Sequence, residues 1–130
     1  AQAYETGITR TFFPHGLGHL LGLQVHDTGG HQKTPNGALR SPPAKHPHLR
    51  LTRVLEPGFV LTIEPGIYFI PMLLKKLSES THKKHINWDL IEEFIPFGGV
   101  RIEDNIVVTT SKVCNLTRQF LPSMNTVSAF

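Results

Sequence analysis

A carboxylate in the middle of an apolar run constrains this chain more than any other feature. The run LEPGFVLTIEPGIYFIP, residues 55–71, opens with a Pro-Gly turn and continues with β-branched and aromatic residues around Glu64. Such residues favour a β-strand. An unpaired buried carboxylate is so costly that it acquires a cation or a proton. We therefore expect a strand in which Glu64 either meets a cation or takes up a proton, with pairing to an arginine or exposure to solvent as the alternatives for a single glutamate in a strand.

A second strand with acidic residues follows later in the chain. A Gly-Gly pair precedes a β-rich segment from about Val100 to Thr109 that contains Glu103. Alternation along a strand places Arg101 and Glu103 on one face, and the same rule puts Thr62 beside Glu64. Arg101 is an alternative partner for Glu103, so this carboxylate alone does not establish a metal site.

Three histidines lie in the glycine-rich stretch PHGLGHLLGLQVHD. They are His15, His19 and His26, separated by four and seven residues. Two carboxylates and an imidazole suit manganese, cobalt or zinc, whereas Cys114 stands apart from these motifs. Spacing alone leaves open that the histidines are hydrogen-bonded structural residues.

The rest of the chain gives a coarse outline of the fold. We expect a strand over residues 7–13, a long surface loop over residues 29–50, and an exposed polar segment over residues 72–85. Asn87 precedes a short helical pattern that stops at a proline, as an N-cap would.

Composition limits the function classes. A length of 130 residues and 39% hydrophobic residues suit one domain, or a piece of one. With 13 basic and 10 acidic residues, the charge is too weak and scattered to indicate nucleic-acid binding. One cysteine excludes an internal disulfide in this sequence and suits a reducing compartment. Without a leader or an apolar run of membrane-spanning length, we expect a soluble, cytoplasmic protein with no membrane association.

Three motifs in order resemble one enzyme family. PHGLGHLLGLQVHD, LEPGFVLTIEPGIYF and PFGGVRIEDNIVVT are similar to the C-terminal catalytic motifs of the Xaa-Pro dipeptidases, or prolidases, in the bacterial branch that includes the organophosphorus acid anhydrolases. The resemblance runs from about Gly7 to Arg118. It implies the α/β "pita-bread" fold of the creatinase and aminopeptidase group, with residues 1–118 as the C-terminal part of the catalytic domain and residues 119–130 as a mobile tail.

The same resemblance implies a site with two divalent metal ions, manganese foremost and cobalt or zinc as alternatives. The metal ligands would be His19, Glu64 and Glu103, with Glu103 bridging the two ions. Glu64 would also carry protons, and Arg101 would orient Glu103 or contact the bridging group. His26 would contact the oxyanion, and His15 would contact the substrate. Arg50, or Arg53 as the second candidate, would bind the prolyl carboxylate. Leu49 would line an apolar pocket. Solvated surface charge for the arginines and simple packing for Leu49 stay open as alternatives.

One departure from the family pattern stands out. The family has two further aspartate ligands upstream, eleven residues apart, and the only aspartates here are Asp27, Asp89 and Asp104. The chain also begins without methionine. We therefore expect a fragment of a longer enzyme, inactive by itself, and the family resemblance implies that the complete enzyme is a homodimer.

Three functions remain in competition at this point. The first is hydrolysis of Xaa-Pro dipeptides, with organophosphate ester hydrolysis as a side activity. The second is an aminopeptidase P type of exopeptidase that acts on longer peptides. The third is a noncatalytic pita-bread domain that binds peptides or proteins.

Overall fold

The computed structural model describes residues 2–121, which separate into two compact units. Unit 1 comprises the described residues up to His15 together with Pro65–Ile102. Unit 2 comprises Gly16–Glu64 together with the described residues from Glu103 onward. Within residues 2–121 no helix is long and apolar enough to cross a membrane.

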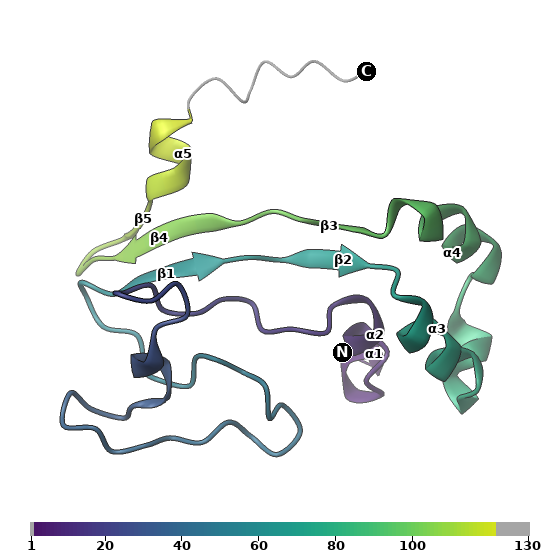
Figure 1. Cartoon of the computed structure of the whole chain (residues 1–130), viewed down its shortest axis with the longest axis horizontal. Coiled ribbons are helices and arrows are strands. Elements are labelled where there is room, and N and C mark those ends of the chain that lie inside the picture. The colour runs from purple at the N-terminus through teal and green to yellow at the C-terminus, as the bar shows by residue number, and fades with distance from the viewer. Residues whose placement is uncertain (1, 122–130) are drawn as a thin grey trace. The chain divides into compact units, whose positions relative to one another are not determined.

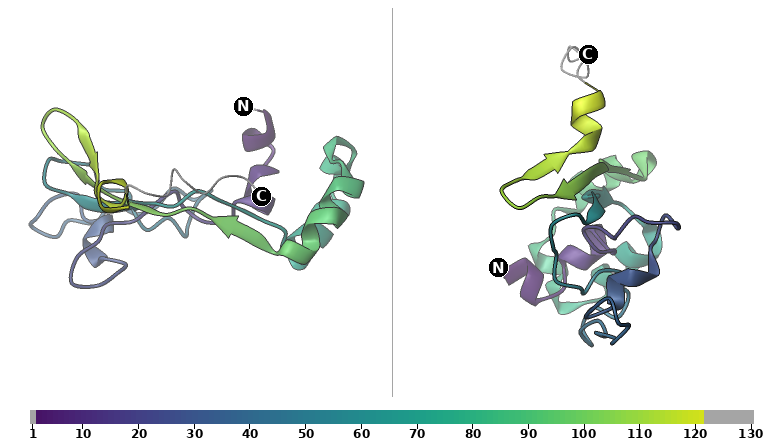
Figure 2. Two further views of the ribbon diagram at one scale, coloured as in Figure 1. Left: turned by 90° about the horizontal axis from the view of Figure 1, so that it is seen from above. Right: turned by 90° about the vertical axis from the view of Figure 1, so that its left-hand side faces the viewer.

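Unit 2 is built around a three-stranded antiparallel sheet. The strands are β1 (Val60–Ile63), β4 (Asp104–Val108) and β5 (Val113–Asn115), in the order β1-β4-β5. Figure 1 shows β1 and β4 side by side, with the long connection that contains the 3-10 helix η1 (Thr28–His31) hanging below them. The helix α5 (Leu116–Phe120) follows β5 directly and leaves the sheet, as Figure 2 shows.

Unit 1 combines short helices with a two-stranded ribbon. Strands β2 (Gly66–Tyr68) and β3 (Gly99–Arg101) pair antiparallel. The helical elements are α1 (Gln2–Glu5), α2 (Thr9–Phe12), α3 (Pro71–Ser78), η2 (Thr81–His85), α4 (Trp88–Phe94) and η3 (Ile95–Phe97). Its buried apolar residues are Leu74, Leu77 and Ile91, and the rings of Phe69 and Phe94 stack with centroids 5.3 Å apart.

Several local predictions are confirmed. The apolar run around Glu64 does form strands, but as two, β1 and β2. The strand expected from Val100 is likewise divided, into β3 and β4, so Arg101 and Glu103 do not share one strand. Residues 29–50 contain most of η1 but no strand or α-helix. The side chain of Asn87 caps α4, because its Oδ1 accepts a hydrogen bond from the backbone N–H of Leu90 at 3.1 Å.

Two local predictions are wrong. Residues 7–13 form no strand: α2 starts after Gly7, whose φ of 79° turns the chain, and the Phe13 N–H bonds the Thr9 carbonyl. Strand propensity has no effect where no neighbouring strand offers a partner. The segment 72–85 is not uniformly exposed either, because α3 buries two leucines among its lysines. Apolar residues three apart form one face of a helix, which the polar composition concealed.

The expected mobile tail over residues 119–130 stays a prediction. Residues 119 and 120 belong to α5. Residues 122–130 lie outside the described part of the chain.

Candidate metal centre

A short segment that contains His19 runs beside β1 as an additional antiparallel neighbour. The backbone N–H of Thr62 bonds the His19 carbonyl at 2.9 Å, and the N–H of Glu64 bonds the Leu17 carbonyl at 2.8 Å. An isolated antiparallel bridge joins the same two stretches. This pairing brings residues far apart in sequence, His19 and Glu64, to the same place in unit 2.

Gly18 makes this close approach possible. A Cβ atom added at Gly18 would lie 1.9 Å from the carbonyl oxygen of Thr62. A real Cβ cannot occupy that position, so any side chain there would push the histidine segment away from β1. The glycine between the histidines is therefore needed for backbone pairing.

His19 and Glu64 meet in a buried environment. Nε2 of His19 lies 3.4 Å from Oε1 of Glu64, and the two side chains are only 4% and 9% exposed. Nδ1 of His19 lies 3.0 Å from the carbonyl oxygen of Leu20. A carbonyl only accepts hydrogen bonds, so Nδ1 carries a proton and donates it there.

This arrangement calls for a positive charge between the two side chains. With the proton on Nδ1, a neutral imidazole presents the lone pair of Nε2 to the Glu64 carboxylate, and both groups are acceptors. Either a second ring proton or a metal ion makes that contact favourable. A backbone carbonyl that fixes Nδ1 and leaves Nε2 for the metal is a recurrent setting of metal-binding histidines. The pair therefore fits a divalent cation.

The hydroxyl of Thr62 connects both ligands, a role that sequence reasoning missed. Oγ1 of Thr62 accepts a hydrogen bond from the His19 N–H at 3.1 Å and donates to Oε1 of Glu64 at 3.3 Å. Thr62 is completely buried. Strand alternation had placed Thr62 on the face of Glu64, and that was the available signal.

His26 lies against the ligand pair. Its ring centroid is 4.3 Å from that of His19, with the planes inclined at 70°. Desolvation, followed by the positive charge of Arg50 and the proximity of His19, lowers the pKa of His26 below 6.5, while Glu64 and Glu103 act in the opposite direction. The structure thus brings four of the predicted site residues into electrostatic reach of His26.

Glu103 is the least organised of the expected ligands. It is exposed and directly precedes β4. Among residues 2–121, no three histidine, cysteine, aspartate or glutamate side chains converge closely enough to hold a metal ion. Two of the three predicted ligands are therefore brought together by the structure, and the third is adjacent in the fold without completing the set.

The segment that carries Leu49 and Arg50 is fastened to η1. Nε2 of His31 lies 2.7 Å from the carbonyl oxygen of Leu49, and the Gly30 carbonyl accepts hydrogen bonds from the N–H groups of Thr52 and Arg53. Arg50 itself is exposed, as a group that binds a soluble anion would be. Arg53 instead lies over the ring of Phe59, 4.6 Å from its centroid, and its side chain is only 10% exposed. Arg50 is thus the more accessible of the two to solvent.

His15 and Arg101 belong to unit 1. Nε2 of His15 lies 2.8 Å from the hydroxyl of Tyr68, and the guanidinium carbon of Arg101 lies 6.0 Å from the centroid of the same ring. Tyr68 is half-buried, and it contributes both a packed ring and a hydroxyl that contacts His15.

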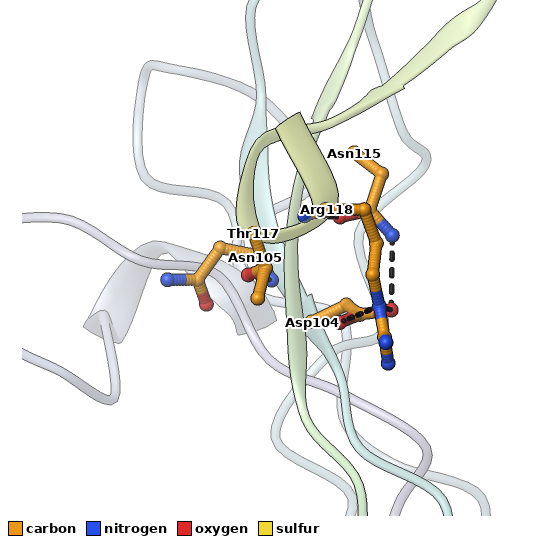
Figure 3. Close-up of polar contacts among 5 residues, drawn as sticks. All are labelled: Asp104, Asn105, Asn115, Thr117 and Arg118. Carbon is orange, nitrogen blue, oxygen red and sulfur yellow. Dashed lines mark hydrogen bonds and ion pairs between the residues drawn. The ribbon is translucent and has the colours of Figure 1, made fainter. Parts of the chain in front are cut away.

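A polar cluster follows Glu103 directly. Nδ2 of Asn115 donates to Asp104 at 2.9 Å, and Nε of Arg118 donates to both carboxylate oxygens of Asp104 at 2.9 and 3.1 Å (Figure 3). The bond from Asn115, followed by the bond from Arg118, lowers the pKa of Asp104 below its ordinary value.

Sequence comparison agrees with this geometry. Residues 1–110 match metallopeptidase family M24, which is most of the chain, and the chain belongs to this family. Similar solved structures are those of aminopeptidase P from E. coli with the inhibitor Pro-Leu and of proline aminopeptidase P II from Yersinia pestis. The sequence identities are 33% and 32%, the TM-scores 0.53 and 0.52, and each match covers 91% of this chain and 20% of the other. These likenesses confirm the pita-bread class of fold.

Relatives at higher identity are Xaa-Pro dipeptidases. Those of Stenotrophomonas maltophilia strain R551-3 and Pseudoalteromonas haloplanktis are 53% and 54% identical to this chain over 95% and 93% of its length. The chain spans 28% of the length of each of these relatives.

Proposed function

We propose that these residues carry part of the metal site and the substrate-binding groups of an Xaa-Pro dipeptidase that uses two divalent ions, manganese foremost. The observation that carries the proposal is the buried contact between Nε2 of His19 and Oε1 of Glu64, which calls for a cation. Dipeptidase relatives above 50% identity support the substrate class.

Three side chains would hold the metal. His19 and Glu64 are buried and already face each other, and Glu103 would join them from the start of β4. When bound, divalent ions supply a strong nucleophile near neutral pH and polarise the scissile carbonyl. Glu64 would accept a proton during attack and return it to the prolyl nitrogen.

The remaining residues would bind and orient the dipeptide. His26 is exposed beside His19, and its lowered pKa keeps it neutral near pH 7, with one ring N–H available to donate to a developing oxyanion. Arg50 would bind the carboxylate of the C-terminal proline through its guanidinium fork, and Leu49 would contact the apolar ring. By family resemblance, His15 would contact substrate, and Arg101 would orient Glu103 or contact the bridging group.

Aminopeptidase P activity is the second candidate, because the similar solved structures are of that enzyme. The two activities differ in the group that the substrate carries on the carboxyl side of proline. A dipeptidase needs a free prolyl carboxylate, whereas an aminopeptidase P accepts a longer chain at that position. Hydrolysis of organophosphate esters is a proposed side activity. Attack on a phosphorus centre also develops negative charge on an oxygen atom, and metal ions stabilise that charge.

The test is hydrolysis of an Xaa-Pro dipeptide and an Xaa-Pro-Xaa tripeptide with added manganese. It is run on the 130-residue chain and on the complete open reading frame that encodes it. We expect dipeptide turnover by the product of the open reading frame, loss of turnover in His19→Ala, and none by the 130 residues alone.

The outcomes separate the candidates. Preference for the tripeptide would favour aminopeptidase P activity. Absence of turnover of either peptide, in a folded product that binds manganese, would leave a noncatalytic domain, for which peptide binding is the next measurement.

A further inference from the structure

Helix α5 and its N-cap residue are hydrogen-bonded to Asp104, the residue that follows Glu103. Nε of Arg118 contacts both carboxylate oxygens of Asp104, and Nδ2 of Asn115 donates to Oδ2 of the same group. Figure 3 shows the Arg118 side chain extending from α5 down to Asp104, with Asn115 reaching the same carboxylate from above. One carboxylate thus receives donors from two residues near the start of α5.

A second contact holds the next residue of the strand. The backbone N–H of Asn105 donates to Oγ1 of Thr117 at 2.8 Å. The Oδ1 atom of Asn115 also caps α5 by accepting from the N–H of Arg118 at 2.9 Å. The helix cap and the contacts to β4 therefore form one connected set, which we call the α5 clamp: Asp104, Asn105, Asn115, Thr117 and Arg118.

The α5 clamp lies directly after Glu103, at the start of β4. The ladder between β1 and β4 begins at the pair Ile63 and Asp104, so Glu103 lies just before the first paired residue of β4. Both residues directly after Glu103 are fixed by α5 as well as by the sheet. Fixing Asp104 and Asn105 limits the backbone directions that Glu103 can adopt at the sheet's end.

We propose that Asp104 and Arg118 are positioning residues that hold Glu103 for binding of a divalent cation. The inference rests on the proposed function, because it takes Glu103 as a metal ligand. Arg118 is half exposed and Asp104 is 20% exposed, and surface ion pairs of this kind contribute little to stability. A role in orienting the neighbouring ligand gives a reason for a network of this extent.

The test measures manganese binding by calorimetry in the product of the complete open reading frame. Arg118→Gln removes the charged donor, and Asp104→Asn weakens the same contact from the other side. The matched control is Gln119→Ala, which removes a side-chain contact of the same helix, from Nε2 to Sγ of Cys114 at 2.8 Å, without touching Asp104.

We expect roughly tenfold weaker manganese binding in Arg118→Gln and in Asp104→Asn, as when partners of metal ligands are removed elsewhere. Gln119→Ala should bind as the wild type does. The melting temperature without metal should be the same in all four proteins, which separates positioning from general stability.

Three results would overturn the inference. The first is wild-type manganese affinity in Arg118→Gln. The second is an equal loss of manganese affinity in Arg118→Gln and Gln119→Ala. The third is unfolding of both Arg118→Gln and Asp104→Asn. The second or the third result would show that the contact between Asp104 and Arg118 is purely structural. A wild-type protein that binds no manganese would overturn the proposed function and this inference together, whereas the other results leave the proposed function intact.

Discussion

The Thr62 hydroxyl joins the two metal-ligand candidates through one atom. It accepts the His19 N–H while it donates to Glu64, and no part of it reaches solvent. A buried group of this kind is costly to remove on one side only, because its partners stay buried without it.

We predict that Thr62→Val destabilises the protein by about 1–3 kcal/mol, because the valine fits the space but leaves the His19 N–H without its acceptor. Chemical unfolding measures the free energy. Thr62→Ser keeps the hydroxyl and is the matched control, so equal losses in both variants would show that the methyl group matters and the hydroxyl does not.

His26 offers a second measurement on a single residue. Without metal, its pKa should lie below 6.5 in an NMR titration of the ring protons. Arg50→Gln should raise that pKa, because it removes a nearby positive charge. The unfolded chain takes up this proton more readily than the folded one, so the contribution of His26 to stability should decline as pH falls below about 6.5. An unchanged His26 titration in Arg50→Gln would show that the two side chains do not interact.

At the scale of elements, the backbone pairing between β1 and the histidine segment organises the site. Gly18→Ala should disrupt it, because the new Cβ would overlap the Thr62 carbonyl. We expect loss of metal binding together with a lower melting temperature, measured by calorimetry and circular dichroism. Leu17→Ala alters the neighbouring, half-exposed side chain without adding an atom to the backbone and should have a small effect. Equal effects of the two substitutions would argue against the steric explanation.

Local sequence signals predicted most of the strands and the cap of α4. The run around Glu64 and the Asn87 cap depend on residues within a few positions of each other, and such patterns can be read directly. The strand expected over residues 7–13 failed because strand formation depends on a partner elsewhere in the chain. The two buried leucines of α3 were missed because composition was weighed above spacing.

In the candidate site, too, local patterns predicted some contacts, and contacts between distant segments were not predictable from them. Alternation placed Thr62 beside Glu64 correctly, because Thr62 lies in β1 and Glu64 directly follows that strand. Nothing in the spacing of the histidines indicated that His19, rather than His15 or His26, would face Glu64. That choice came from family resemblance, and its physical cause is pairing between segments some forty positions apart, which Gly18 permits.

At the scale of the whole molecule, each unit has a small apolar core. Among residues 2–121, unit 2 buries two leucines, Leu20 and Leu61, and unit 1 buries three apolar side chains. Large apolar side chains are exposed at several positions, among them Leu23, Met72, Phe97 and Phe120. Exposed apolar surface of this kind favours association.

We predict that the 130-residue chain alone self-associates and binds a hydrophobic dye strongly, because its buried apolar surface is small beside the apolar surface that it exposes. Analytical ultracentrifugation and dye fluorescence measure the two properties. A monodisperse monomer with a sharp thermal transition would contradict this expectation.

The pairing of β1 with β4 has a consequence for how the chain can vary in length. These strands are antiparallel neighbours, yet residues 64–103 separate them, so most of unit 1 occupies the position of a hairpin loop. The entropy of closing a loop grows only logarithmically, by about 0.6 kcal/mol for each doubling of length. The stability of unit 2 therefore sets little limit on the length of this connection. Insertions and deletions within the connection are limited mainly by the packing of unit 1.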